Sequence, residues 1–206
     1  MPVKLPFLGT ARPERGGELA VVLTGGGARG AYQVGLLRWL ARNFPGLRIP
    51  IVTGVSAGAV NAAYIAGHMH EFSTAAARLA DRWVQLTPEH VFATDVRSLA
   101  GNVASWGFRL LSGGRHTHAG TRGLVDTAPL FDFLTDVLGD GGGGIAGVAE
   151  NLRRGELQAV AISTTSYTTG ESVVWVQGRE IELWTRPQRR AVQTELRVEH
   201  VMASTA

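Results

Sequence analysis

Ser56 is the residue whose neighbours in the sequence point most clearly to chemistry. It stands in a G-x-S-x-G segment, between an apolar run at residues 49–53 and a run of small residues. In that context the glycines permit a sharp turn from a strand into a helix, which lifts the serine hydroxyl out of the sheet as a nucleophile. The sequence therefore predicts an acyl-transfer nucleophile at Ser56, on an elbow formed by Gly54, Val55, Ala57 and Gly58.

A second glycine-rich segment precedes Ser56 by one strand and one helix. Backbone N–H groups exposed at such a turn are suited to bind the oxyanion that develops when a serine attacks a carbonyl. An arginine within the segment is placed to steady the loop or the charge. We predict an oxyanion loop made of Gly25, Gly26, Gly27, Ala28, Arg29 and Gly30.

The same loop also fits G-x-G-x-x-G, the fingerprint of a dinucleotide site. That fingerprint requires an acidic residue about 20 positions further on, where it holds the ribose. No aspartate or glutamate stands between Gly30 and Glu71. The sequence therefore argues against a nicotinamide or flavin cofactor, and we predict none. A purely structural glycine turn remains the alternative.

The elements that position these two segments follow from hydrophobic periodicity. Residues 19–23 and 49–53 are short apolar runs, typical of strands buried in a parallel sheet. Residues 28–44 show a helical apolar stripe, and a helix of small residues is predicted from the second glycine segment to Gly67. In such an α/β arrangement the carboxyl ends of neighbouring parallel strands meet at one edge of the sheet. The two segments should therefore form a single site.

Further elements are predicted along the rest of the chain. Helices are expected at residues 71–87 and 127–138, with Thr127 as the N-cap of the second. A flexible loop is predicted at Asp140 and the glycines after it, and residues 157–163 are predicted to form a third apolar strand. A hairpin is expected from residues 173–176 and 180–184, and a final helix from Ala191 onward.

Taken together, the residues resemble the patatin-like phospholipases. In that family a strand leads into G-G-G-x-R-G, and the next strand leads into G-x-S-x-G; here these motifs stand at residues 25–30 and 54–58. The likeness covers roughly residues 19–206, which we expect to form one catalytic domain after a flexible lead-in at residues 1–18. It implies a three-layer α/β fold with a mostly parallel central sheet. Looser likeness continues at residues 124–130, 161–165, 169–171 and 200–206.

The resemblance implies a lipid acyl hydrolase of the phospholipase A or lysophospholipase type. Such an enzyme uses a Ser–Asp dyad without a histidine, which makes Ser56 the nucleophile and residues 25–30 the oxyanion hole. The family's aspartate lies in a D-G-G or D-G-A segment shortly after a helix like the last one here, and none follows Ala206. We expect a chain that stops before its base, with little activity and a tendency to self-associate.

Two alternatives to the dyad enzyme stay open. The first is a catalytically silent fragment that only binds lipid or a partner. The second is an ordinary α/β-hydrolase esterase, because Ser56, Asp140 and His200 follow the required order of serine, acid and histidine. Against the triad, that fold places its elbow after several strands, whereas Ser56 follows only the second. Asp140 starts the chain's only Asp-Gly-Gly, which precedes the third strand, and we interpret it as a loop residue.

Composition excludes several other function classes. The chain has 206 residues, 45% hydrophobic and 18% charged, which is typical of a globular protein. It has no cysteine, so disulfides, thiolate nucleophiles and iron–sulfur clusters are excluded. A net charge of +3 is too small to indicate nucleic acid as a partner. His116 and His118 have no carboxylate close by in the sequence, and we predict no metal site.

The expected relation to membranes is peripheral. Residues 49–69 carry no formal charge and are long enough to span a bilayer, but they are rich in Gly, Ala and Ser. We interpret them as a buried strand, turn and helix. The N-terminus lacks the apolar stretch of a signal peptide, so a cytoplasmic protein in transient contact with a membrane surface is expected. Residues 99–111 are a candidate for that contact or for packing over the active site.

Overall fold

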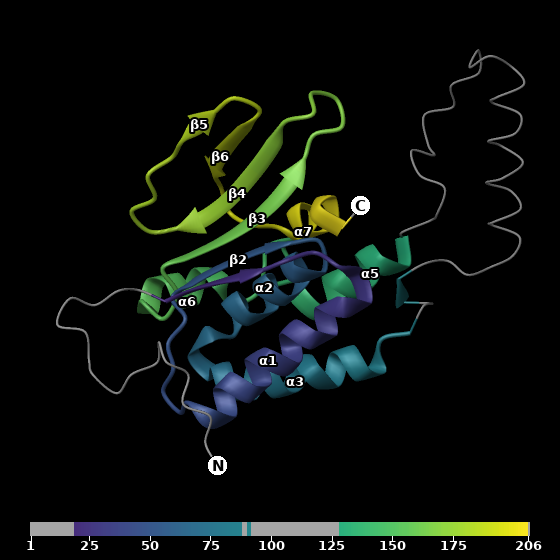
Figure 1. Cartoon of the computed structure of the whole chain (residues 1–206), viewed down its shortest axis with the longest axis vertical. Coiled ribbons are helices and arrows are strands. Elements are labelled where there is room, and N and C mark those ends of the chain that lie inside the picture. Colours follow the sequence, from purple (N-terminus) through teal and green to yellow (C-terminus); the bar gives the residue numbers. More distant parts are fainter. Residues whose placement is uncertain (1–18, 88–89, 92–127, 206) are drawn as a thin grey trace, which may run out of the picture.

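The computed structural model describes residues 19–87, 90–91 and 128–205. Within them the chain forms a mixed α/β fold, in which a six-stranded, mostly parallel sheet is flanked by helices (Figure 1). This confirms the α/β class and the mostly parallel sheet expected from the sequence. The interpretations placed on Thr127, residues 99–111, His116 and His118 lie outside the described residues.

The sheet has the strand order β1-β2-β3-β4-β6-β5. The pairs β1–β2, β2–β3 and β4–β6 are parallel, and the pairs β3–β4 and β5–β6 are antiparallel. Pro50 stays outside the ladder, as expected of a residue without an N–H to donate. The strands are β1 (Ala20–Leu23), β2 (Ile51–Val55), β3 (Ala159–Thr165), β4 (Ser172–Gly178), β5 (Thr185–Arg186) and β6 (Arg189–Gln193).

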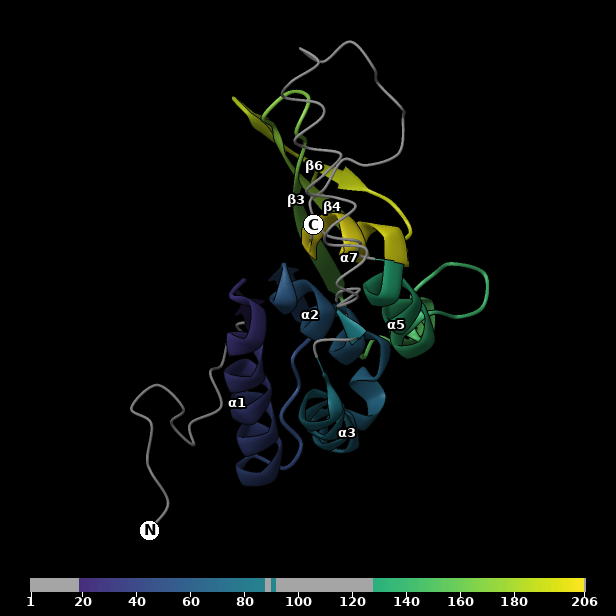
Figure 2. The same cartoon turned by 90° about the vertical axis from the view of Figure 1, so that its right-hand side faces the viewer.

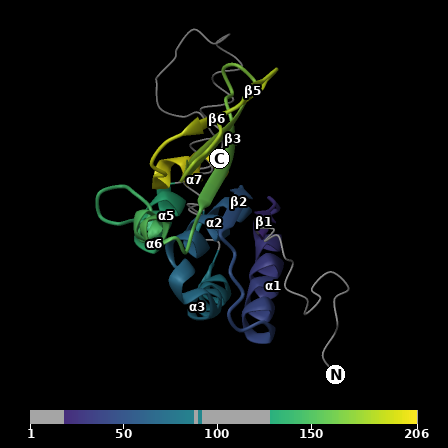
Figure 3. The ribbon, with the colours of Figure 1, turned by 90° about the vertical axis from the view of Figure 1, so that its left-hand side faces the viewer.

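The helices pack around α2 (Ala57–Gly67), which contacts five other helices and three strands. Figures 2 and 3 show α2 in the middle of the helical layer, between α1 and α5. Ten of its 11 residues are buried, because alanine and glycine let neighbouring elements approach closely. The other helices are α1 (Gly30–Asn43), α3 (Phe72–Gln85), α5 (Ala128–Leu138), α6 (Val148–Arg154) and α7 (Val198–Thr205), with short 3-10 turns η1 (Gly27–Arg29) and η2 (Met69–Glu71).

The uncharged stretch at residues 49–69 therefore forms β2, the turn at Ser56 and α2, as the sequence analysis proposed. Its apolar side chains are part of the protein's own core, where Val52 and Ile65 are buried. Among the described residues, every helix is too short or too polar to cross a membrane.

Two predictions about the C-terminal third were wrong. Residues 180–184 form no strand: β4 pairs antiparallel with β3 and parallel with β6, and Glu180 adopts a positive φ of 54° that breaks the extended chain. Ala191 is likewise not helical but lies in β6, opposite Val174 of β4, and α7 begins only at Val198. In both places pairing with a distant strand decided the structure, which local sequence pattern does not report.

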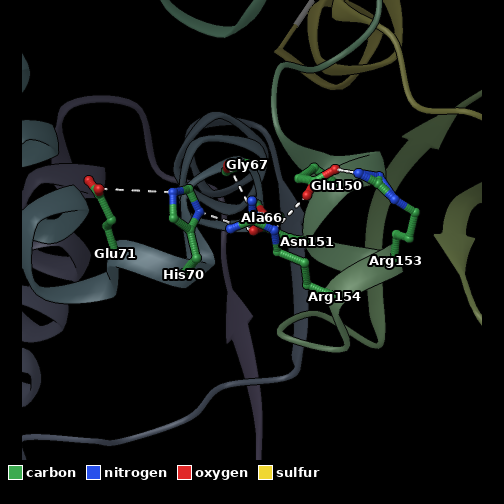
Figure 4. Close-up of polar contacts among 8 residues, drawn as sticks. All are labelled: Ala66, Gly67, His70, Glu71, Glu150, Asn151, Arg153 and Arg154. Atoms are coloured by element: carbon green, nitrogen blue, oxygen red, sulfur yellow. Dashed lines mark hydrogen bonds and ion pairs between the residues drawn. The ribbon is translucent and has the colours of Figure 1, made fainter.

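Helix α6, which the sequence analysis did not predict, is fixed by one buried amide. Asn151 donates from Nδ2 to the carbonyls of Ala66 (2.8 Å) and Gly67 (2.9 Å), and so satisfies the C-terminal end of α2 (Figure 4). Its Oδ1 lies 3.1 Å from Nδ1 of His70. On the surface of α6, Glu150 pairs with both Arg153 and Arg154. These contacts anchor the segment that leads into β3.

Candidate active site

Ser56 occupies a strained turn between β2 and α2. Its φ of 54° and ψ of −128° lie where side chains other than glycine are rarely found, as in the nucleophile elbow of serine hydrolases. Gly54 and Gly58 make this turn possible: a Cβ on Gly54 would overlap the carbonyl of Gly58, and one on Gly58 would lie 2.6 Å from the carbonyl oxygen of Thr24. The strained turn and the missing side chains together place Ser56, which is half-buried, at the N-terminus of α2.

The glycine loop lies directly opposite Ser56. Leu23, the last residue of β1, is paired with Gly54 in β2, so both turns leave the same edge of the sheet. A Cβ on Gly25 would be 3.1 Å from the Cβ of Ser56 and 3.8 Å from its Oγ. Gly26 and Gly27 have φ values of 152° and 55°, which glycine adopts without cost. The structure thus brings the two predicted segments into one site.

Within the loop, some N–H groups are used to close the turn itself. The N–H of Arg29 donates to the carbonyl of Gly26 at 3.1 Å, and the N–H of Gly30 is also bound inside the turn. The side chain of Arg29 is exposed and lies along Gly26. These bonds shape the loop that faces Ser56.

A buried amide holds both ends of the glycine loop. Asn61 of α2 is 0% exposed, and its Nδ2 donates to the carbonyl of Gly30 (3.2 Å) and to Oε1 of Gln33 (3.1 Å). Gln33 in turn donates from Nε2 to the carbonyl of Thr24 at 2.6 Å. The Oδ1 of Asn61 accepts a 2.8 Å hydrogen bond from Nε1 of Trp83 on α3. One side chain therefore joins the loop, α1, α2 and α3.

Ser204 of α7 approaches the elbow from the other side. Its Oγ accepts the backbone N–H of Ser56 at 2.8 Å and donates to the carbonyl of Ser163 in β3 at 2.7 Å. Residues from β2, β3 and α7 thus meet at the nucleophile.

A cavity of about 640 Å³ opens beside Ser56. Its volume lies within the range typical of small-molecule sites. The glycine loop and Ser56 form one wall, together with Thr205 at the end of α7. The other walls are mostly apolar and come from α2, α3, α5 and the segment after α3. Among the described lining residues Arg82 is charged, and the larger apolar side chains are Val60, Leu79, Trp83, Leu86, Val91, Leu130, Phe133, Leu134 and Val137.

The two other members of the alternative triad lie away from this cavity. The carboxylate of Asp140 accepts the N–H groups of Gly142 (2.8 Å) and Gly144 (2.9 Å), and it lines a separate cavity of about 410 Å³. None of the residues around that cavity borders the one at Ser56. The sequence predicts a flexible loop at residues 140–144, but the structure holds this loop around the Asp140 carboxylate through these two hydrogen bonds.

His200 lies in the first turn of α7 and is not among the residues that line the cavity at Ser56. Its Nδ1 accepts the N–H of Arg197 at 2.9 Å, and its ring lies 4.8 Å from that of Trp175. Burial lowers the pKa of His200 below its ordinary value, and this outweighs the neighbouring Glu199, which acts in the opposite direction. Because Nδ1 serves as a helix cap, the ring needs to stay neutral to keep this hydrogen bond.

Among the described residues no group of three histidine, aspartate or glutamate side chains is arranged to hold a metal ion. Sequence reasoning did not single out Gln33, Asn61, Trp83 or Ser204. The signal that could have indicated Asn61 is local, because it is the one strongly polar side chain in a helix of small and apolar residues. The others carry no such signal.

Comparison with known proteins identifies a family and one solved structure with some likeness to this chain. A family model described as patatin-like phospholipase matches residues 21–172, which include both glycine segments and Ser56. A search of curated proteins gives no match. Among solved structures, the heterodimeric ExoU–SpcU complex from the type III secretion system of Pseudomonas aeruginosa shares 20% identity at a TM-score of 0.40, over 91% of this chain and 36% of that one. The present chain thus spans about a third of that protein's length.

Proposed function

The chain belongs to the patatin-like phospholipase family, and from that membership and the surroundings of Ser56 we propose that it hydrolyses acyl esters of lipids through an acyl-Ser56 intermediate. One observation carries the proposal. A serine on a strained elbow faces a glycine loop at the wall of a largely apolar cavity. A nucleophile, oxyanion donors and a place for an acyl chain are three of the features that such a reaction needs, and a general base is the fourth.

In the proposed reaction, Oγ of Ser56 attacks the ester carbonyl and forms a tetrahedral intermediate. Its oxyanion is bound by N–H groups of the glycine loop between Gly25 and Ala28, since those of Arg29 and Gly30 close the turn. The N-terminal end of α2, directly after Ser56, adds a favourable dipole. Collapse of the intermediate releases the alcohol, and water then releases the fatty acid.

In this proposal an aspartate takes the proton from Ser56, as the family resemblance implies for a Ser–Asp dyad, and no aspartate of the 206 residues is assigned that role. The positions of the alternative partners support this choice over a triad. Asp140 borders a different cavity, and Nδ1 of His200 is used as a helix cap. The expected signature is hydrolysis that does not depend on an imidazole.

The walls of the cavity favour an apolar acyl group over a polar one. Burying a polar group against side chains such as Leu134 and Phe133 would cost free energy without a compensating hydrogen bond. We therefore propose phospholipids or lysophospholipids as substrates, with the acyl chain between α3 and α5 and the ester at Ser56.

The test is release of fatty acid from phosphatidylcholine and lysophosphatidylcholine vesicles by the wild-type chain and Ser56→Ala. The wild-type chain is expected to show little turnover without its base, and loss of the nucleophile should lower that turnover to background. Ser73→Ala is a matched control, because Ser73 is exposed at the opposite end of α3 from Trp83, about 15 Å along the helix. Equal turnover by wild type and Ser56→Ala would contradict the proposal. Vesicle binding without any turnover would favour the silent, lipid-binding alternative.

A further inference from the structure

The main-chain N–H of the nucleophile is bound by a side chain 148 residues away. Ser56 N–H donates to Oγ of Ser204 at 2.8 Å, and the same hydroxyl donates to the carbonyl of Ser163 at 2.7 Å. Ser163 is itself opposite Val55 in the β2–β3 pairing, next to the elbow. The hydroxyl of Ser204 therefore accepts one hydrogen bond and donates another, which uses its single proton completely.

This arrangement bears on the strain at Ser56. A non-glycine residue at φ 54° and ψ −128° is held there only if its surroundings fix it. Gly54 and Gly58 permit the turn by leaving space, but they supply no attractive contact to Ser56 itself. The carbonyl of Ser56 is bound within α2, where it accepts the N–H of Ala59 at 2.7 Å. Ser204 holds the other side of the residue, its N–H.

The same bond decides which donors face the substrate. In some serine hydrolases the N–H of the nucleophile is itself one of the oxyanion donors. Here that N–H points to Ser204, so it is taken out of the set that could bind an oxyanion. The glycine loop opposite Ser56 is left to do so.

We propose that Ser204 is a positioning residue of the active site, which fixes the elbow through the N–H of Ser56 and leaves oxyanion binding to the glycine loop. The proposal rests on the proposed function of Ser56 for its catalytic consequence, but the hydrogen bond itself can be measured independently. Ser204 acts through Ser56 and touches no reacting atom.

A merely structural role would be to dock α7 onto the sheet. The helix has other contacts for that purpose. Val198 and Val201 are 1% and 0% exposed, and His200 packs against Trp175 of β4. Removing the Ser204 hydroxyl should therefore leave α7 in place and release the elbow locally.

The experiment compares Ser204→Ala with Ser204→Thr in the full chain, and it has two readouts. The first is amide hydrogen exchange at Ser56, followed by NMR. The second is the rate at which a fluorophosphonate probe labels Ser56. We expect exchange about tenfold faster or more and labelling about tenfold slower in Ser204→Ala, and both within about threefold of wild type in Ser204→Thr, which keeps the hydroxyl.

Thr135→Val is the matched control, since it also removes a hydroxyl that donates to a main-chain carbonyl, in α5, at 2.8 Å. It should leave exchange at Ser56 unchanged. Unchanged exchange in Ser204→Ala would overturn the proposal. Should Ser204→Ala not fold, an unprotected Ser56 amide in the wild-type chain would overturn it equally. Absence of labelling in the wild type would count against the proposed function, while the exchange result would still decide the role of Ser204.

Discussion

Replacing Asn61 by leucine tests whether the buried amide holds the active site together. The two side chains branch at the same atom and have the same number of heavy atoms, so the change removes the hydrogen bonds and keeps the shape, with bulkier methyl groups in place of the amide. It deletes the bonds to Gly30 and Gln33 and leaves Nε1 of Trp83 without its acceptor. Asn61 is 0% exposed, so water cannot readily replace these partners.

The magnitude follows from the groups left without partners. Two main losses, at the Gly30 carbonyl and at Nε1 of Trp83, cost roughly 1–3 kcal/mol each, partly offset by the added apolar burial of leucine. A net loss of about 2–4 kcal/mol corresponds to a Tm lower by about 5–15 °C for a chain of this size. Labelling of Ser56 by a fluorophosphonate should also slow, because Gln33, which donates to the carbonyl of Thr24, loses the hydrogen bond from Asn61 that orients its side chain.

The assay is thermal unfolding followed by circular dichroism, with Asn43→Leu as the control. Asn43 is exposed at the end of α1, and its Nδ2 donates to the carbonyl of Trp39 at 2.8 Å. At such a site the same substitution should change stability by only about 0.5 kcal/mol. If Asn61→Leu lowered Tm no more than Asn43→Leu does, the reasoning about the buried amide would be refuted.

Two further predictions concern glycine packing and pH. Gly58→Ala should abolish labelling of Ser56 by the fluorophosphonate probe, because its Cβ would lie 2.6 Å from the carbonyl oxygen of Thr24. Gly35→Ala, with open space around it in α1, should instead raise the free energy of unfolding by about 0.5–1 kcal/mol, as measured by denaturant unfolding. Burial lowers the pKa of His200 in the folded chain below its unfolded value of about 6.5. The stability contributed by the neutral His200 ring is therefore fully present above pH 6.5, and it is lost as the pH falls through the lower folded pKa. His200→Gln should therefore reduce the fall in unfolding free energy between pH 7.5 and 5.5, and it should leave the rate of Ser56 labelling within a few-fold of wild type. An unchanged slope of unfolding free energy against pH, or a thousand-fold loss of labelling, would contradict this.

The parts of the site that the sequence could predict are those with local turn chemistry. The glycines around Ser56 and at residues 25–30 stand where close approach or positive φ requires them, and each follows an apolar strand. Parallel pairing of β1 with β2 then places them together. The order of the sheet beyond β3 was not predictable in the same way, since R-R-A-V-Q in β6 has no apolar alternation and is extended because it pairs with β4.

The supporting side chains were missed for a related reason. Ser204 meets Ser56 across 148 residues, and Trp83 meets Asn61 only because α3 packs against α2. Such contacts depend on how helices dock, and a serine near the end of a helix or a tryptophan on a helix face is common without any role of this kind. Asp140 and His200 follow the serine–acid–histidine order of a triad in the sequence, but in the fold Asp140 borders a separate cavity and His200 caps α7.

The central claim is that Ser56 is the activated nucleophile, and mapping a fluorophosphonate adduct by mass spectrometry tests it most directly. Tryptic cleavage after Arg48 and Arg78 gives a peptide that contains both Ser56 and Ser73, so fragment ions within one peptide distinguish the elbow serine from an exposed one. The account predicts a single adduct on Ser56, retained in Ser73→Ala and absent from Ser56→Ala. No adduct on the wild-type chain, an adduct on another residue, or labelling that persists in Ser56→Ala would contradict it.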